Sequence, residues 1–471
     1  MTILQVGVLA LAAAGVGQLK RGRSLALLGA SVFAIYWLQS PQQFVSLAFW
    51  LPTATLALTV SIWILVTPAE ERTWRGNLSS ALVISGVILL VDLNQFIGFE
   101  EVFMTTTPRL WMIGLALIFC AGLFAILIVY SKFRSLFLGT ALLGILLIFV
   151  YLKSPELITN SFDLVYRLRG QAIPDTHYVL SWLGYSYMAF RLLHTIRDHQ
   201  TGRLPSLSLG EYVNYVIFFP SFTAGPIDRA ERFVQDLRSP SPVGDQEWIQ
   251  AGKRFFLGLF KKYVIADTLA LISINDILVE QVHSAGWMWF FLYMYSLRIY
   301  FDFSGYTDVA IGIARVMGVR LPENFAAPYM KPNLAQFWNS WHMTLTHWFR
   351  TYFFNPTTRA LRSGKRHLPA VLVILVTQVS TMVLIGLWHG IAWGFVVWGL
   401  WHGVGLFIQN RWSELLRRRT MSPISPQRKL VLDAIGVFLT FNFVSLGWLF
   451  FTLSTPATAW RALLRLFGVA S

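Results

Sequence analysis

The chain has 471 residues, of which 55% are hydrophobic and 13% are charged, about half the ~25% charged share of a soluble domain. This composition excludes an ordinary soluble enzyme, a disordered protein and a small secreted disulfide scaffold. The net charge of +15 arises mainly from short loops between apolar runs, so it indicates orientation in a membrane rather than binding to nucleic acid.

Long apolar runs predict an all-α, polytopic membrane protein. A helix needs about 20 apolar residues to cross the hydrocarbon core, so we expect about 10–12 transmembrane helices, with further helices lying in the bilayer. Candidate spans lie near residues 3–19, 24–39, 44–67, 78–98, 109–130, 136–152, 177–196, 211–224, 253–275, 285–303, 369–388, 391–410 and 430–453.

Basic residues occur in alternate loops, which predicts the orientation. Lys20, Arg72 and Lys132 lie in the loops after the first, third and fifth runs, whereas residues 39–43 and 98–107 contain no Lys or Arg. Because basic loops stay in the cytoplasm, we expect the N-terminus outside a plasma (inner) membrane. The C-terminus is also expected outside, because one span follows the basic cluster that ends at Arg419.

Composition divides the chain into three parts. Residues 1–175 are strongly apolar and are predicted to be a transmembrane scaffold. The apolar runs of residues 176–410 contain His, Asp, Arg, Asn, Gln and Trp. Such groups are costly at membrane depth and are mostly functional or paired, so this part is predicted to do the chemistry. Residues 411–471 are expected to form a cytoplasmic basic loop and a C-terminal transmembrane helix.

Two charged segments stand out in the middle of the chain. Asp228 and Arg229 follow Gly225-Pro226 and predict a helix break with a charged turn. Lys261 and Lys262 end an apolar segment. They either reach a membrane face along their apolar stems or bind an anionic donor such as a phosphopantetheine group.

A third charged pair lies further along. Arg298 and Asp302 are four residues apart, so on a helix they could form an ion pair that reduces the cost of burial. We favour this structural interpretation for both residues.

Two histidines are the main candidates for chemistry. His389 lies between Trp388 and Gly390 in an apolar stretch, and His342 lies in a Trp-rich segment. No pattern of nucleophile or metal ligands accompanies them, so we expect proton transfer involving a hydroxyl rather than metal binding. His402 is a structural residue or a third imidazole; a metal site is the less favoured alternative.

The segment around His342 reads as one continuous helix. Spacing would then place Trp338, His342, Leu345 and Phe349 on one face, with Arg350 near its end. For any single aromatic ring, packing is favoured over substrate contact. The candidate substrate-binding residues are Trp338, Asn339, Trp341, Arg350, Trp388, Lys261 and Lys262.

Six motifs resemble, in the same order, those of the membrane-bound O-acyltransferase family, in its bacterial branch. They are FFP with GPIDR at 218–229, GLFKK with IAD at 258–267, YFDFSGY at 300–306, PENF with PY at 322–329, WH at 341–342 and WHG at 388–390. The first resembles members that transfer D-alanine toward teichoic acid. The next three resemble members that acetylate alginate, and the last two match both.

This resemblance implies a fold and site residues. It implies a ring of helices around a thin central tunnel, with residues 176–410 as the catalytic acyltransferase core. His389, in WHG, would be the catalytic residue and His342 the second active-site position, both near the middle of the membrane. Thr351 follows Arg350 where the family often has an acidic residue.

The resemblance also implies a reaction. An acyl group would pass from a cytoplasmic thioester, acetyl-coenzyme A or an acyl carrier protein, to a hydroxyl of a cell-surface polysaccharide or polymer, or to an extracellular partner protein. Acetyl is the first expectation and D-alanyl the second. No bound cofactor or metal is implied, and membrane lipid surrounds the chain.

Two non-enzymatic functions compete with this expectation. The chain could transport a lipid-linked sugar, since intramembrane charges and basic loops also fit a transporter. It could instead be a scaffold subunit of a machine that secretes a surface polymer, with its histidines merely packed. Turnover of a labelled thioester by the purified protein would separate the three.

Overall fold

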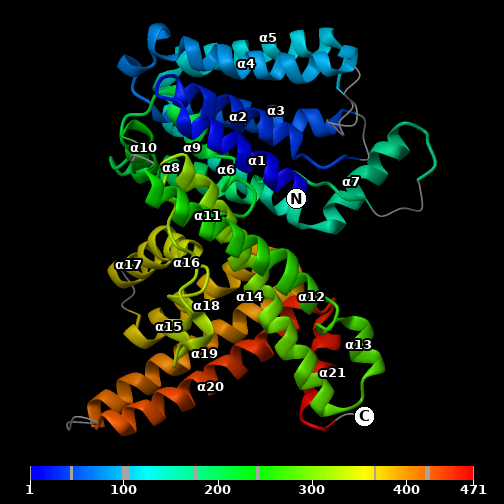
Figure 1. The fold of residues 1–471 in the computed structure, drawn as a ribbon, viewed down its shortest axis with the longest axis vertical. Coiled ribbons are helices and arrows are strands. Elements are labelled where there is room, and N and C mark those ends of the chain that lie inside the picture. The colour runs from blue at the N-terminus through cyan, green and yellow to red at the C-terminus, as the bar shows by residue number, and fades with distance from the viewer. Residues whose placement is uncertain are drawn as a thin grey trace. The chain divides into compact units, whose positions relative to one another are not determined.

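The computed structural model describes residues 2–42, 46–97, 107–173, 178–239, 244–364, 368–419 and 425–469. These residues are mostly helical and include no strand, which confirms the all-α class (Figure 1). The loop near residues 98–107, which contains no Lys or Arg and is expected outside the membrane, lies almost wholly beyond the described ranges.

The structure contains the following α-helices, in chain order. They are α1 (Ile3–Gln18), α2 (Arg23–Trp37), α3 (Leu47–Val66), α4 (Trp74–Ile97), α5 (Leu110–Val129), α6 (Arg134–Lys153), α7 (Pro155–Leu168), α8 (Tyr185–Gln200), α9 (Leu209–Ile217), α10 (Ala230–Arg238), α11 (Asp245–Leu259), α12 (Asp267–Ala270), α13 (Asp276–Gln281), α14 (Ala285–Val316), α15 (Leu334–Trp338), α16 (Met343–Phe349), α17 (Asn355–Ser363), α18 (Ala370–His389), α19 (Trp393–Arg419), α20 (Pro426–Thr452) and α21 (Pro456–Leu466). Two π-helices, η3 (Phe260–Ala266) and η5 (Arg350–Phe354), and three short 3-10 helices, η1 (Ala69–Glu71), η2 (Ser131–Phe133) and η4 (Pro328–Met330), complete the set.

Six helical segments in the described ranges are long and apolar enough to cross a membrane. They are Leu47–Val66, Trp74–Leu93, Leu110–Val129, Ser131–Lys153, Ala370–His389 and Pro426–Thr452. Helices α1 and α2 are apolar but shorter. Helices α14 and α19 are longer than about 20 residues but carry charged side chains. The chain is thus a helical membrane protein, and the expected total of 10–12 crossings stays a prediction.

The chain forms two compact units. One contains Met1–Phe255 with Ala310–Leu321, and the other contains Phe256–Val309 with Pro322–Ser471. Both α11 and α14 contribute residues to each unit. The division by composition at residues 175 and 410 stays a prediction.

In the first unit, local sequence signals set the ends of α9. Ser208 and Glu211 form a capping box at its start, because each side chain accepts a hydrogen bond from the other residue's backbone N–H. The helix ends at Ile217, and a turn leads through Pro220 to α10. The predicted break before Asp228 is therefore confirmed.

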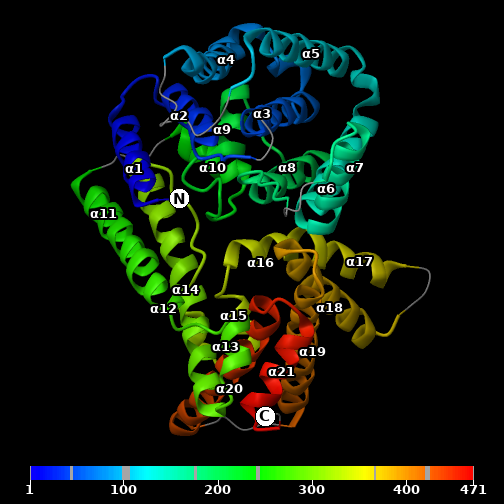
Figure 2. The ribbon, with the colours of Figure 1, turned by 90° about the vertical axis from the view of Figure 1, so that its right-hand side faces the viewer.

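In the second unit, α18 and α19 form a tightly packed helical hairpin (Figure 2). Glycines on α19 permit the close approach, since a Cβ atom on Gly399 would lie 2.6 Å from the Val383 Cα, and one on Gly403 would lie 2.8 Å from the Val379 Cα. This hairpin carries both His389 and His402.

Candidate active site

The segment expected to be one helix is broken at His342. Helix α15 ends at Trp338 and α16 begins at Met343, and His342 between them has left-handed backbone angles, φ 43° and ψ 54°. The expectation of a single helical face through Trp338, His342, Leu345 and Phe349 is therefore wrong. The left-handed region is unfavourable for a residue with a Cβ atom, so neighbouring structure must hold it.

Asn324 holds this bend. Its main-chain carbonyl accepts a hydrogen bond from the Met343 N–H at 3.0 Å. Its side-chain Oδ1 accepts from the Thr344 N–H at 3.2 Å and from the Thr344 hydroxyl at 2.8 Å. These bonds satisfy backbone donors at the start of α16 that have no partner within the helix.

The His342 imidazole is deeply buried, with 2% of the residue exposed. Its Nδ1 lies 3.2 Å from Asn324 Oδ1, and the Phe303 ring packs edge-on against it with 4.7 Å between centroids. Within the described part of the chain, its Nε2 atom is buried and has no hydrogen-bond partner. Burial among rings favours the uncharged imidazole.

His389 lies close to His342 because both rings contact the Trp388 indole. The Trp388 centroid is 6.0 Å from that of His342 and 4.5 Å from that of His389. His389 is the last residue of α18, and Gly390 continues in an extended conformation. The Phe451 ring packs edge-on against His389, with 4.8 Å between the ring centroids. The two histidines singled out from the sequence are therefore brought together.

His402 lies in a neighbouring aromatic cluster on α19. It is fully buried and contacts the Trp338 and Trp398 rings, with centroids 5.3 and 5.0 Å away. The Trp398 ring is also 5.9 Å from that of His389. Among the residues that the structure describes, no group of three His, Cys, Asp or Glu side chains is placed to hold a metal ion.

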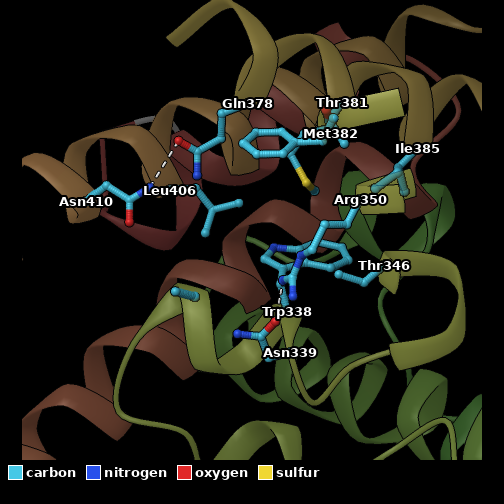
Figure 3. Close-up of a pocket in the computed structure, with 12 residues that line it drawn as sticks. Trp338, Asn339, Thr346, Arg350, Gln378, Thr381, Met382, Ile385, Leu406 and Asn410 are labelled. Carbon is cyan, nitrogen blue, oxygen red and sulfur yellow. Dashed lines mark hydrogen bonds between the residues drawn. The ribbon is translucent and has the colours of Figure 1, made fainter. Parts of the chain in front are cut away.

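A pocket of about 220 Å³ opens beside this cluster (Figure 3). Three residues predicted to bind substrate, Trp338, Asn339 and Arg350, line it, and Arg350 Nη2 donates to Asn339 Oδ1 at 2.5 Å. Across the pocket, Asn410 donates to Gln378 at 3.2 Å. Neither His342 nor His389 lines the pocket, but Trp338 joins its wall to the aromatic cluster around His402.

The two lysines predicted to bind an anionic donor are paired with carboxylates. Lys261 Nζ lies 2.6 Å from Asp308, and Lys262 Nζ lies 2.5 Å from Asp302. Both lysines belong to η3, which lies against α14. Asp302 therefore pairs with Lys262, and the ion pair expected between Arg298 and Asp302 does not form. Spacing along one helix could not reveal a cation brought by another segment.

The remaining predicted residues lie in structural surroundings. Trp341 is 5% exposed and stacks on Phe337 at 5.6 Å, so it packs within the aromatic core. Asp228 belongs to the first unit, where it is buried, accepts from the Arg229 N–H at 2.8 Å and pairs with Arg232. The Arg229 side chain is exposed.

Sequence reasoning missed the side chains of Asn324, Gln378 and Asn410. Asn324 lies in the PENF motif, but its role depends on contacts with residues 342–344 that no local pattern reveals. Gln378 is an amide within the apolar run of α18, and such a polar group at membrane depth is a usable signal.

Comparison with known proteins adds a family match. The model of the membrane-bound O-acyltransferase family (MBOAT) matches residues 140–455, about two thirds of the chain. This range includes every residue of the candidate site.

Three relatives are named for three different activities. A teichoic acid D-alanyltransferase of Streptococcus thermophilus is 32% identical over 296 residues, covering 59% of this chain and 70% of the relative. A probable alginate O-acetylase of Azotobacter vinelandii is 29% identical over 407 residues, covering 82% and 77%. A peptidoglycan O-acetyltransferase of Helicobacter pylori is 31% identical over 265 residues, covering 55% and 47%.

Proposed function

The chain belongs to the membrane-bound O-acyltransferase family, and we propose that it transfers an acetyl group from a cytoplasmic thioester to a hydroxyl of a cell-surface polysaccharide or polymer. As a family member it is an O-acyltransferase, which sets aside the transporter and the scaffold. The observation that carries the proposal is that the imidazole rings of His342 and His389 both contact the indole of Trp388.

The two histidines have distinct proposed roles. His389 takes the proton of the acceptor hydroxyl as its oxygen attacks the thioester carbonyl. The carbon–oxygen bond forms, the carbon–sulfur bond breaks, and the departing sulfur receives the proton. His342 orients the acceptor or polarises the carbonyl. The rate gain from one such base is about 10²–10⁴-fold.

The pocket beside Trp338 supports a site for the donor arm. Its lining includes the Arg350 guanidinium, the amides of Asn339, Gln378 and Asn410, and apolar side chains. This combination suits a chain that contains amides and ends in a phosphate, as in coenzyme A or the arm of an acyl carrier protein. Lys261 and Lys262 fit this role less well, because carboxylates already neutralise them.

The acyl group is proposed as acetyl because the alginate-type relative matches along more of the chain, 82% against 59%. D-alanyl transfer toward teichoic acid or a similar polymer is the second candidate, and the 32% identity to the D-alanyltransferase favours it. In both cases we propose a plasma-membrane enzyme with a narrow passage between the two faces. The acceptor would be the polymer itself or an extracellular partner protein.

Purified protein in lipid vesicles tests the function. Labelled acetyl-coenzyme A, acetylated carrier protein and D-alanylated carrier protein are each offered with alginate, teichoic acid or peptidoglycan. We expect acetyl transfer, and a His389→Ala rate at least about 10²-fold lower, as expected when a general base is lost. The control is His283→Ala, since His283 is exposed outside the candidate site. Undiminished transfer by His389→Ala would refute the assignment.

A further inference from the structure

The orientation of the Asn324 side-chain amide is fixed by a backbone donor. The Thr344 N–H points at one amide atom from 3.2 Å, and a main-chain N–H can only donate. That atom must therefore be the oxygen, because a flipped amide would place an NH₂ group against another donor in a buried site. The Thr344 hydroxyl, 2.8 Å from the same atom, is compatible with this orientation.

The fixed amide in turn fixes the proton on His342. Nδ1 lies 3.2 Å from Asn324 Oδ1, and two lone pairs facing each other at that distance in a buried site would repel. Nδ1 therefore carries the hydrogen and donates it to Oδ1. In a neutral imidazole the other nitrogen, Nε2, then bears a lone pair and no hydrogen.

We propose that Asn324 is a positioning residue that holds His342 in the Nδ1–H tautomer, so that Nε2 accepts a hydrogen bond from a second hydroxyl of the acceptor, next to the hydroxyl that reacts. This inference rests on the proposed acyl transfer and deepens it. Nε2 is suited to that role because it is buried and has no partner among the described residues. The aromatic rings of Phe303 and Trp388 hold the plane of the imidazole.

The tautomer selects between the two roles open to His342. Polarising the thioester carbonyl requires an N–H directed at its oxygen, and a bare Nε2 offers none. Orienting the acceptor through a second hydroxyl, next to the one whose proton passes to His389, requires a lone pair, which Nε2 supplies. An amide, unlike a carboxylate, holds the ring in place without adding a buried negative charge, so the imidazole stays neutral before reaction.

Nitrogen NMR reads the tautomer directly. The full-length protein, labelled with ¹⁵N in its histidine rings, is reconstituted without substrate at neutral pH, and a His342→Gln sample identifies the signals of His342. We expect a protonated Nδ1 and an unprotonated Nε2 in the wild type. A protonated Nε2 with a bare Nδ1 would overturn the proposal whether or not the protein transfers acetyl groups.

Kinetics of Asn324 variants provide the second test. Asn324→Leu removes the acceptor oxygen but keeps the main-chain bond from Met343, so we expect mixed tautomers and a kcat about 10²-fold lower with little change in the donor KM. Asn324→Asp keeps an acceptor for Nδ1–H but adds a negative charge that favours a proton on both ring nitrogens, so we expect its kcat to be low at neutral pH and to recover as the pH rises.

The matched control is Asn275→Leu. Asn275 caps α13 by accepting from the Leu278 N–H at 2.9 Å, so its loss affects a helix end but no histidine. We expect wild-type kcat and an unchanged His342 spectrum. An Asn324→Leu enzyme with wild-type kcat, or an equal loss in Asn275→Leu, would contradict a positioning role. Loss of activity in Asn324→Leu with the tautomer unchanged would also contradict it, while leaving the proposed acyl transfer intact.

Discussion

At the residue scale, the candidate site combines uncharged buried imidazoles with an exposed cation, Arg350, that lines a pocket. His342 and His402 are almost fully buried, where an ionised group would be costly without a partner. Arg350 is exposed and contacts Asn339, so its charge stays available at the pocket. The buried imidazoles therefore form a region suited to neutral proton acceptors, and the pocket lined by Arg350 forms a separate region suited to an anionic donor.

Arg350→Ala should weaken binding of the donor without altering the chemical step. We expect the donor KM to rise about tenfold and kcat to hold, because one hydrogen bond to a charged group contributes about 1.5 kcal/mol. Arg350→Lys should recover part of this affinity, since an ammonium group lacks the planar fork of a guanidinium. Initial rates over a series of acetyl-coenzyme A concentrations measure both parameters.

Arg359→Ala is the control for charge alone. Arg359 is an exposed cation on α17 that does not line the pocket. If its removal raises KM as much as the loss of Arg350, general attraction of an anion explains the effect and the pocket assignment is wrong.

The sequence motifs predicted the two candidate histidines, but not the side chain that hydrogen-bonds to His342. The Trp-His and Trp-His-Gly motifs singled out His342 and His389, and the structure brings both to Trp388. Asn324 could not be assigned a role, because its amide meets the imidazole only after residues 340–344 fold back on residues 324–326. Tertiary hydrogen bonds of this kind have no periodicity to detect.

At the element scale, periodicity located long helices well and missed irregular ones. The apolar runs near 109–130, 369–388 and 430–453 agree closely with α5, α18 and α20. The break at His342 was missed because residues 336–350 contain neither Gly nor Pro. The π-helices η3 and η5 were also missed, since one extra residue in a turn leaves the composition unchanged.

Close packing of α18 against α19 depends on Gly399. A Cβ atom there would lie 2.6 Å from the Val383 Cα and 2.7 Å from the Met382 carbonyl oxygen, and neither backbone atom can rotate away. Gly399→Ala should therefore separate the hairpin and cost about 1–3 kcal/mol of stability. Acetyl transfer should fall too, because the hairpin carries His389 and Trp398. The loss of monodisperse protein on heating in detergent measures the change in stability. The rate of acetyl transfer measures the change in activity.

Gly122→Ala provides the comparison. Gly122 is an exposed helical residue of α5 with no atom within 4 Å of an added Cβ, so alanine should be neutral or slightly stabilising. Equal melting temperatures for the two variants would mean that α18 and α19 are not as closely packed as the structure has them.

At the scale of the whole molecule, lipid exposure and charge placement explain why the chain needs a membrane. Helices α5 and α6 carry many exposed large apolar side chains, among them Phe119, Leu136 and Leu147. A surface of this kind is stable only against lipid or protein. The charged groups of α14 are instead partly buried, and Asp302 and Asp308 are each paired with a lysine. Composition was thus a sound guide to the environment of the chain, whereas its number of crossings stays a prediction.

The alternation of basic loops predicts which face of the membrane supplies the thioester. If the loops with Lys20, Arg72 and Lys132 are cytoplasmic, reporters fused there should behave as cytoplasmic proteins, and so should one fused after Arg419. A reporter at either terminus, or inserted near residue 104, should be extracellular. Paired fusions to an enzyme active only outside the cell and to a fluorescent protein active only inside give opposite signals at each site, so each fusion controls the other. If the reporter after Arg419 were extracellular, the last helix would cross the membrane in the opposite direction to the predicted one. The basic cluster would then lie on the face away from a cytoplasmic donor.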